Sequence, residues 1–222
     1  MKKSTKNNRI LSMLWILLPT IGILLANSDT QACTVFRMKA TNGNITIGRS
    51  MEFGVNLNYD LIVVPRNTLL MSPSPVSKVG MKWKTKFGYV GVASMGMDFG
   101  VSDGMNEKGL AVSVLWYESD MQYQTVAPAD STIALAQVMF SDWALGNFSS
   151  VDEVKAATLQ SKVFFYEDTT KMKMPVTVHF IVYDAQGGCI TVEYDKGVCN
   201  IYDNTLGIMT NSPSLPWHYN NL

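Results

Sequence analysis

The sequence predicts an α+β protein in which two helices pack against antiparallel β-sheet. Strand-like segments fill the first half of the chain, two helix-like segments follow, and further strand-like segments come after them. That order favours helices gathered on one face of a sheet over helices that alternate with parallel strands. The strand-like segments contain many glycines and few charges. We therefore expect sheets covered by helices on one face and by a second sheet on the other.

Alternating apolar residues bounded by turn residues predict five strands in the first half of the chain. These strands are 34–39, 45–50, 59–64, 87–94 and 109–117. The stretch ATNGN between the first two predicts a hairpin. Two segments are predicted to be loops: 67–80, which contains Pro73 and Pro75, and 95–108, which contains several glycines and the stretch DGMNEKG.

Two helices are predicted in the middle of the chain. Residues 131–145 have helical spacing, with Ser131 as the N-cap and Gly146 as the stop. The second helix opens at SSVDEVKAA, where Ser150 and Glu153 fit a capping box. Three further strands follow the helices: 176–184, 189–195 and 198–203.

Residues 1–32 are predicted to be a secretory signal peptide. Lysines and an arginine open the segment, an apolar run follows, and a short polar stretch ends in a small residue. Cleavage after Ala32, with Thr30 and Ala32 at the positions that require small residues, would make Cys33 the first residue. An uncleaved anchor is one alternative, although the apolar run is shorter than the roughly 20 residues that span a bilayer. A lipoprotein signal, which would acylate Cys33, is another, and Gln31 fits that signal badly.

Composition excludes one class of partner. The chain has 18 Lys+Arg and 18 Asp+Glu, and removal of residues 1–32 takes away four bases and one acid, leaving 14 against 17. A net charge near −3 argues against a nucleic-acid partner. Residues 33–222 are long enough for one domain with a sizeable core. The sequence has no metal cluster, phosphate loop or haem motif, so neither a metal nor a cofactor is predicted.

The three cysteines allow one disulfide at most. Cys189 and Cys199 lie on strands that form a hairpin turning at residues 195–197, and in that register Cys199 faces Tyr194. A slip of about five residues at ~3.3 Å each separates the two cysteines along the strands. Because a disulfide needs Cα atoms within about 7 Å, no Cys189–Cys199 bond is expected. Cys33 remains the unusual cysteine.

An N-terminal cysteine supplies both members of a catalytic pair. Its thiol is the nucleophile, and its α-amine, with an ordinary pKa of about 7.7–8.0, can take the proton. The alternative, a papain-like Cys–His pair, needs one of the two histidines, His179 or His218, beside Cys33. His179 lies in the middle of a predicted strand, where a structural role is the simpler interpretation.

Arg49 and Glu52, in GRSMEFG, are candidate partners of Cys33. The first hairpin returns Arg49 to the start of the first strand, and an arginine near a thiol favours the reactive thiolate. A carboxylate can hold a terminal ammonium by a charge-assisted hydrogen bond. The alternative is a surface Arg–Glu pair that contributes little.

Several motifs follow one another along the chain: CT after a predicted processing site, GRSMEF, DGMNEKGLAV, HFIVYDAQGG, IMTNSP and WHYNNL. Together they resemble the choloylglycine hydrolase family, which includes penicillin V acylases and conjugated bile salt hydrolases. The resemblance implies an N-terminal nucleophile (Ntn) hydrolase with an αββα sandwich that cleaves linear amide C–N bonds. It also implies Cys33 as nucleophile and base, Arg49 beside the thiol, Glu52 beside the α-amine, and Asn211 at the oxyanion.

Three departures from the family pattern matter. Many members have aspartate in place of Glu52, and many have an oxyanion-donating asparagine in place of Trp116. Family chains are also longer, and an active-site arginine lies in their C-terminal part. We therefore expect an incomplete sandwich in 33–222, either as a fragment or as a natural truncation, which would leave sheet edges open.

The expected substrate is a small linear amide with an apolar acyl group, of the penicillin V, N-acyl amino acid or lactone, or conjugated bile salt type. Met51, Phe53 and Trp116 are candidate pocket residues, together with Trp83 and Phe99. The signal predicts a periplasmic or secreted protein with no membrane partner after cleavage, and the resemblance allows a homo-oligomer. The competing hypothesis is an inactive fragment or a lipid-anchored binding protein of the same fold.

Overall fold

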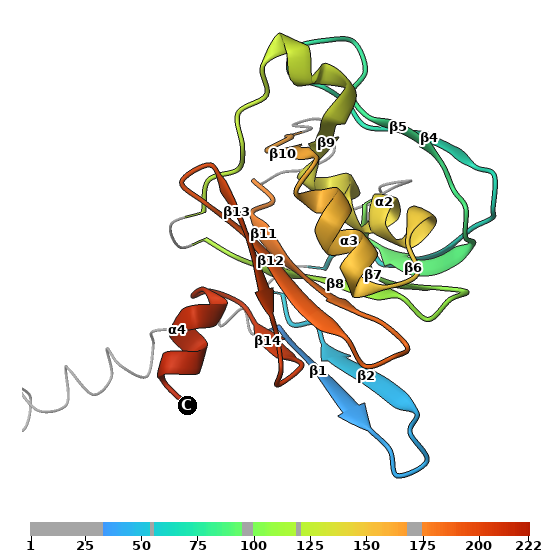
Figure 1. The fold of residues 1–222 in the computed structure, drawn as a ribbon, viewed down its shortest axis with the longest axis vertical. Helices are drawn as coiled ribbons and strands as arrows, with labels where there is room; N and C mark the ends of the chain where they lie inside the picture. Colours follow the sequence, from blue (N-terminus) through green and yellow to red (C-terminus); the bar gives the residue numbers. More distant parts are fainter. Residues whose placement is uncertain (1–32, 54–55, 95–99, 119–120, 168–174) are drawn as a thin grey trace, which may run out of the picture. The chain divides into compact units, whose positions relative to one another are not determined.

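The computed structural model describes residues 33–53, 56–94, 100–118, 121–167 and 175–222, all of which belong to one compact unit (Figure 1). Its centre is a seven-stranded antiparallel sheet in the order β13-β12-β11-β8-β7-β6-β3. These strands are β3 (Asp60–Val64), β6 (Tyr89–Ala93), β7 (Val101–Asn106), β8 (Ala111–Trp116), β11 (Val178–Tyr183), β12 (Cys189–Asp195) and β13 (Val198–Asp203).

A second sheet joins the two ends of the described chain. Its order is β14-β1-β2, and both pairings are antiparallel. The strands are β1 (Thr34–Lys39), β2 (Ile45–Ser50) and β14 (Ile208–Thr210). Two small sheets pair β4 (Leu69–Met71) with β5 (Lys82–Lys84) and β9 (Ala134–Ala136) with β10 (Lys162–Phe164).

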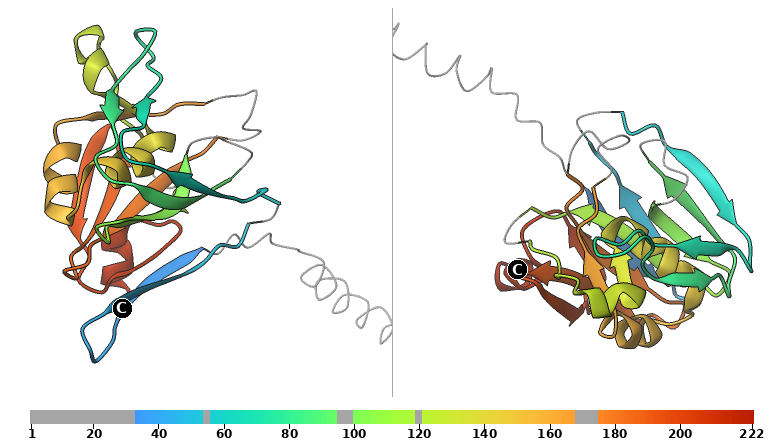
Figure 2. Two further views of the ribbon diagram at one scale, coloured as in Figure 1. Left: turned by 90° about the vertical axis from the view of Figure 1, so that its right-hand side faces the viewer. Right: turned by 90° about the horizontal axis from the view of Figure 1, so that it is seen from above.

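Helices and the second sheet cover opposite faces of the seven-stranded sheet (Figure 2). The helices are α2 (Phe140–Asn147) and α3 (Val151–Thr158), and the short α4 (Leu215–Asn220) follows β14. Strand alternation sends neighbouring side chains of β11 to opposite faces. Phe180 packs in the helix-side core with Phe140, whereas Ile181 packs in the inter-sheet core with Val35. The layered α+β prediction is confirmed for the described residues.

Part of the sheet face opposite the helices is exposed. Large apolar side chains there include Leu61 on β3, Val90 on β6 and Met105 on β7, which are 75%, 41% and 44% exposed. Among the described residues, no helix is long and apolar enough to cross a membrane.

The prediction of a loop over 95–108 is wrong for the described part of that range, because Val101–Asn106 form β7 near the middle of the large sheet. Residues 95–99 lie outside the described residues. The glycine that suggested a loop has a packing role: a Cβ on Gly104 would lie 2.7 Å from Leu145 Cδ1 of α2 and 2.9 Å from Val90 O. The helix therefore crosses the sheet where the strand has no side chain. The predicted loop at 67–80 likewise contains a strand, β4.

The helix predicted over 131–145 is only partly present. Residues 128–133 and 137–139 form 3₁₀ turns on either side of β9, and α2 begins at Phe140. Ser131 lies inside the first turn and caps no helix, and α2 runs one residue past Gly146. Backbone groups that would bond within a helix instead bond to residues distant in the sequence. Ala134 O accepts a hydrogen bond from Met81 N, and Ala136 N donates to Ser72 Oγ.

The second helix and the two hairpins are confirmed. Ser150 Oγ accepts the Glu153 N–H of α3, while the Glu153 carboxylate reaches back to the N–H of Ser149 rather than of Ser150. The β1–β2 hairpin spans the predicted residues. In the last hairpin Cys199 faces Tyr194, and all three cysteines are free, so the expected absence of a Cys189–Cys199 bond is confirmed.

Gly104→Ala should lower the free energy of unfolding by about 1–3 kcal/mol, because the added methyl overpacks the crossing of α2 and β7. Gly88→Ala is the matched control, because its Cβ would meet nothing nearer than Val64 O at 3.5 Å. That variant should stay within about 0.5 kcal/mol of the parent in urea unfolding. Equal stability of the two variants would show that the crossing tolerates a side chain.

Candidate active site

Cys33 lies directly before β1 and is held from two sides. Its carbonyl oxygen accepts a hydrogen bond from Thr210 Oγ1 at 2.8 Å, and its Sγ lies 3.8 Å from the Glu52 carbonyl oxygen. The side chain is 3% exposed and packs in the inter-sheet core with Val35 and Met209. In the 222-residue chain the Cys33 nitrogen is an amide, so a free α-amine exists only after the bond to residue 32 is cut.

Arg49 extends from β2 to the large sheet. It sits opposite Val35 in the β1–β2 register, and its Nη1 lies 2.8 Å from Asp103 Oδ1 and 2.7 Å from Asp103 Oδ2 on β7. Nη1 also donates to Ser102 O at 3.3 Å. The two charged side chains are 11% and 22% exposed. The structure therefore places the predicted Arg49 in a largely buried ion pair that ties the two sheets together.

Asp103 is a site residue that the sequence did not reveal. It pairs with Ser113 in the β7–β8 register and accepts a hydrogen bond from the Ser113 side chain. Burial raises the pKa of Asp103, and Arg49 and Ser113 offset part of that rise. A strand assignment for DGMNEKG would have been the signal, because it aligns Asp103 with β8.

Tyr59 shows that these groups share one neighbourhood. Burial raises the pKa of Tyr59, and the nearby Cys33 and Asp103 raise it further, while Arg49 lowers it. The tyrosine precedes β3, so four segments far apart in the sequence converge here: the chain before β1, β2, β7 and the approach to β3.

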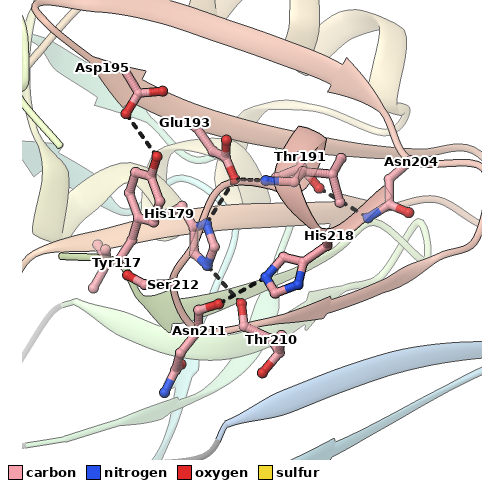
Figure 3. Close-up of polar contacts among 12 residues, drawn as sticks. Tyr117, His179, Thr191, Glu193, Asp195, Asn204, Thr210, Asn211, Ser212 and His218 are labelled. Atoms are coloured by element: carbon pink, nitrogen blue, oxygen red, sulfur yellow. Dashed lines mark hydrogen bonds and ion pairs between the residues drawn. The ribbon is translucent and has the colours of Figure 1, made fainter. Parts of the chain in front are cut away.

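Asn211 follows β14 at the level of Cys33. Thr34 pairs with Thr210, so the next residue on each antiparallel strand, Cys33 and Asn211, lies at the same end of the pair. Asn211 Oδ1 accepts the Trp116 backbone N–H at 3.0 Å, which orients the carboxamide. In Figure 3 the side-chain nitrogen of Asn211 points away from His218.

Glu52 is not brought to Cys33 by its carboxylate. The Glu52 side chain is exposed. The Glu52 atom that lies against Cys33 Sγ is the backbone carbonyl oxygen. Its role beside a free α-amine stays a prediction for the processed chain.

A cavity of about 500 Å³ lies beside the Arg49–Asp103 pair. Met51 and Tyr59 line it together with apolar side chains of β3, β6 and β7. Its polar groups are few, so it suits an apolar ligand with one polar end.

Two of the predicted pocket aromatics contact each other. The rings of Phe53 and Trp116 meet edge to face with centroids 5.6 Å apart. Trp83, in contrast, is buried in the helix-side core, so its assignment to the pocket is wrong. Phe99 lies outside the described residues.

The two histidines have other partners than the thiol. His179 is fully buried, with Nδ1 at 3.1 Å from Glu193 Oε1 and Nε2 at 3.0 Å from Thr210 O. His218 Nε2 lies 3.3 Å from Asn211 O. Within the described residues neither ring bonds Cys33, which confirms the structural interpretation of His179 and gives no support to a Cys–His pair.

Comparison with known proteins agrees with this fold. Residues 33–222 match the family described as linear amide C–N hydrolases, choloylglycine hydrolase family. The Clostridium perfringens bile salt hydrolase/transferase is 31% identical over 198 residues, 86% of this chain and 56% of the relative. The Pectobacterium atrosepticum penicillin V acylase is 27% identical over 216 residues, 94% of this chain and 57% of the relative.

Solved structures give the same result. A variant of the conjugated bile acid hydrolase from Clostridium perfringens superposes with a TM-score of 0.72 at 30% identity, covering 85% of this chain and 56% of that one. Penicillin V acylase from Agrobacterium tumefaciens gives 0.71 at 28% identity, covering 85% and 55%. The fold is that of an Ntn hydrolase, and the chain belongs to the choloylglycine hydrolase family. It spans 56–57% of the length of these two curated relatives.

Asp103→Leu should lower the free energy of unfolding by about 2–3 kcal/mol, because it leaves the Arg49 guanidinium unpaired in a largely buried place. The double variant Arg49→Met/Asp103→Leu should be more stable than Asp103→Leu alone, because no charge is then left without its partner. Urea unfolding of the parent, both single variants and the double variant measures this. A double variant less stable than Asp103→Leu would contradict it.

The thiols of Cys189 and Cys199 should resist alkylation in the folded protein. Burial raises the pKa of Cys189 to about 12 and raises that of Cys199. At pH 8 only about one Cys189 in ten thousand is then a thiolate, the reactive form. Iodoacetamide followed by peptide mass spectrometry should leave both unmodified for as long as it takes to label them fully in urea. Rapid labelling of Cys189 in the native protein would refute this.

Proposed function

We propose that this protein, once processed so that Cys33 is its first residue, is an Ntn cysteine amidase. It hydrolyses the linear amide C–N bond of a small molecule with an apolar acyl group. The observation that carries the proposal is the placement of Cys33: Thr210 holds its carbonyl oxygen, and Asn211 and the Arg49–Asp103 pair lie around it. Membership of a family of linear amide hydrolases supports the same chemistry.

The proposed reaction has two stages. The α-amine of Cys33 takes the thiol proton, and Sγ attacks the substrate carbonyl carbon to form a tetrahedral oxyanion. The Asn211 side-chain NH₂ donates to that oxyanion, while the Trp116 backbone N–H donates to Asn211 Oδ1 and so orients the carboxamide. Collapse breaks the C–N bond, and the ammonium returns its proton to the leaving amine. Water then attacks the thioester, with the amine as base, and releases the acid and the free thiol.

Two other residues receive proposed roles from their positions. Arg49 supplies positive charge near the thiol, and Asp103 fixes its direction. Glu52 is exposed and close to Cys33 through its backbone. Its proposed role in the processed chain is to turn its carboxylate toward the new ammonium. The Trp116 indole has an N–H donor, but the ring is too bulky to hold it where an asparagine amide would lie. We therefore assign the oxyanion to Asn211.

The cavity supports an apolar acyl group. It has a volume of about 500 Å³, and its lining is mainly aliphatic apart from Arg49, Tyr59, Asp103 and Ser113. The relatives named above act on bile salts and penicillin V, and both substrate types unite an apolar acyl group with a polar leaving group. Phenoxyacetyl, fatty acyl and bile acyl amides are therefore the substrates to test.

Export of the chain is part of this proposal. The signal at 1–32 would deliver the chain to the periplasm or the outside and create the Cys33 amine by cleavage after Ala32. The competing proposal is an inactive or lipid-anchored protein of the same fold. The chemical state of the Cys33 amine distinguishes the two, because a free amine permits the reaction and an acylated one forbids it.

Cys33→Ser should lower the hydrolysis rate of the preferred amide at least about 1,000-fold, because a hydroxyl is a far weaker nucleophile than a thiolate. Cys199→Ala is the control and should keep its rate, because Cys199 packs against the helix-side core and not at the site. Intact mass of protein from its native compartment must show unmodified Cys33 at the N-terminus. Undiminished activity of Cys33→Ser, or an acylated Cys33, would overturn the proposal.

A further inference from the structure

A buried histidine–glutamate pair lies behind the candidate site. His179 on β11 and Glu193 on β12 are both 0% exposed, and their Nδ1 and Oε1 atoms are 3.1 Å apart (Figure 3). The Tyr117 ring stacks on the imidazole at 4.7 Å with an interplanar angle of 5°, and its hydroxyl donates to Asp195. The imidazole is thus held on its face by the tyrosine and at both nitrogens by hydrogen bonds.

The hydrogen-bond partners place the protons of this pair. Thr210 O can only accept, so His179 Nε2 carries the hydrogen of the 3.0 Å bond between them. Glu193 Oε1 already accepts the Leu215 backbone N–H at 2.9 Å, at the start of α4. One proton therefore lies between Nδ1 and Oε1, and the pair as a whole acts as a donor toward Thr210.

The peptide that receives this hydrogen bond carries the proposed catalytic groups. Thr210 O belongs to the peptide unit between Thr210 and Asn211. On one side of that unit, Thr210 Oγ1 holds the Cys33 carbonyl at 2.8 Å. On the other side, Asn211 Oδ1 accepts Trp116 N–H, and Ser212 N donates to Trp116 O at 3.0 Å. Rotation of this one peptide plane would move both the nucleophile's support and the oxyanion donor.

We propose that His179 and Glu193 are positioning residues of the amidase site, which orient the 210–211 peptide so that Thr210 and Asn211 meet Cys33 correctly. This inference rests on the proposed function. A buried polar pair of this kind is a poor source of stability, since apolar side chains of similar volume often do as well. Glu193 Oε2, moreover, is buried without a hydrogen-bond partner. The His179–Glu193 pair donates a hydrogen bond to Thr210 O, which apolar residues could not do.

Two substitutions of His179 separate the donor from the bulk of the ring. Glutamine places its side-chain nitrogen near the position of imidazole Nε2, so His179→Gln can still donate to Thr210 O. Asparagine places its nitrogen near Nδ1, so His179→Asn faces Glu193 and cannot reach Thr210. A displacement of about 1 Å at a catalytic group can cost about 100-fold in rate. We expect kcat of the asparagine variant to be at least about tenfold below that of the glutamine variant, with KM nearly equal.

Asp184→Asn is the matched control. Asp184 is also a buried carboxylate, 5% exposed, but it accepts from Val151 N and Gly188 N beyond the far end of β11. Its substitution should lower the unfolding temperature without changing kcat of the folded enzyme. Equal kcat of the two His179 variants, each corrected for its folded fraction, would overturn the inference.

Amide hydrogen exchange gives a readout that needs no substrate. His179→Asn should speed exchange at the Trp116 and Glu118 amides, which donate to Asn211 Oδ1 and Ser212 Oγ, while His179→Gln and Asp184→Asn should not. If the parent hydrolyses no amide but exchange changes as expected, the proposed function fails and the positioning of the peptide stands. If the parent is active and exchange at these amides is unchanged in His179→Asn, the inference alone fails.

Discussion

The pairing of β1 with both β2 and β14 is the constraint on which the candidate site depends. It joins segments from the two ends of the described chain, since Thr34 faces Ser50 on one side and Thr210 on the other. Cys33, at the end of this central strand, therefore has Glu52 and Asn211 as its neighbours without any special loop. A slip of one residue would turn every side chain of the strand to the other face and remove Cys33 from the inter-sheet core.

Two side-chain contacts, one an ion pair and one a hydrogen bond, connect this small sheet to the large one. Arg49 of β2 reaches Asp103 of β7, and His179 of β11 reaches Thr210 of β14. They lie on opposite sides of β1, so each limits how far its neighbouring strand can shift. Polar and charged groups buried in this way cost desolvation energy that hydrogen bonds must offset. Proteins tolerate such a cost in stability where a functional site requires a particular geometry.

Local patterns in the sequence predicted much of the fold, because strand alternation and turn residues act over a few positions. The β1–β2 hairpin and the Tyr194–Cys199 register followed from such patterns. Patterns failed where a distant segment determined the conformation. Residues 134–136 had helical spacing, yet they pair with β10, a segment almost thirty residues further along the chain, and all three are fully buried there. Gly104 indicated a turn, yet it serves the contact with α2.

The sequence alone determined the chemical groups of this protein: a cysteine that follows a predicted signal segment, an arginine on the returning strand, a carboxylate just after that strand, and Asn211. It also determined the family, because those residues occur in separate motifs in a fixed order. Only the tertiary structure decided that Arg49 faces Asp103, that Glu52 turns its carboxylate outward, and that His179 supports the peptide beside Cys33. Those outcomes depend on which side chains two packed sheets bring within hydrogen-bonding distance, and no local pattern encodes that distance.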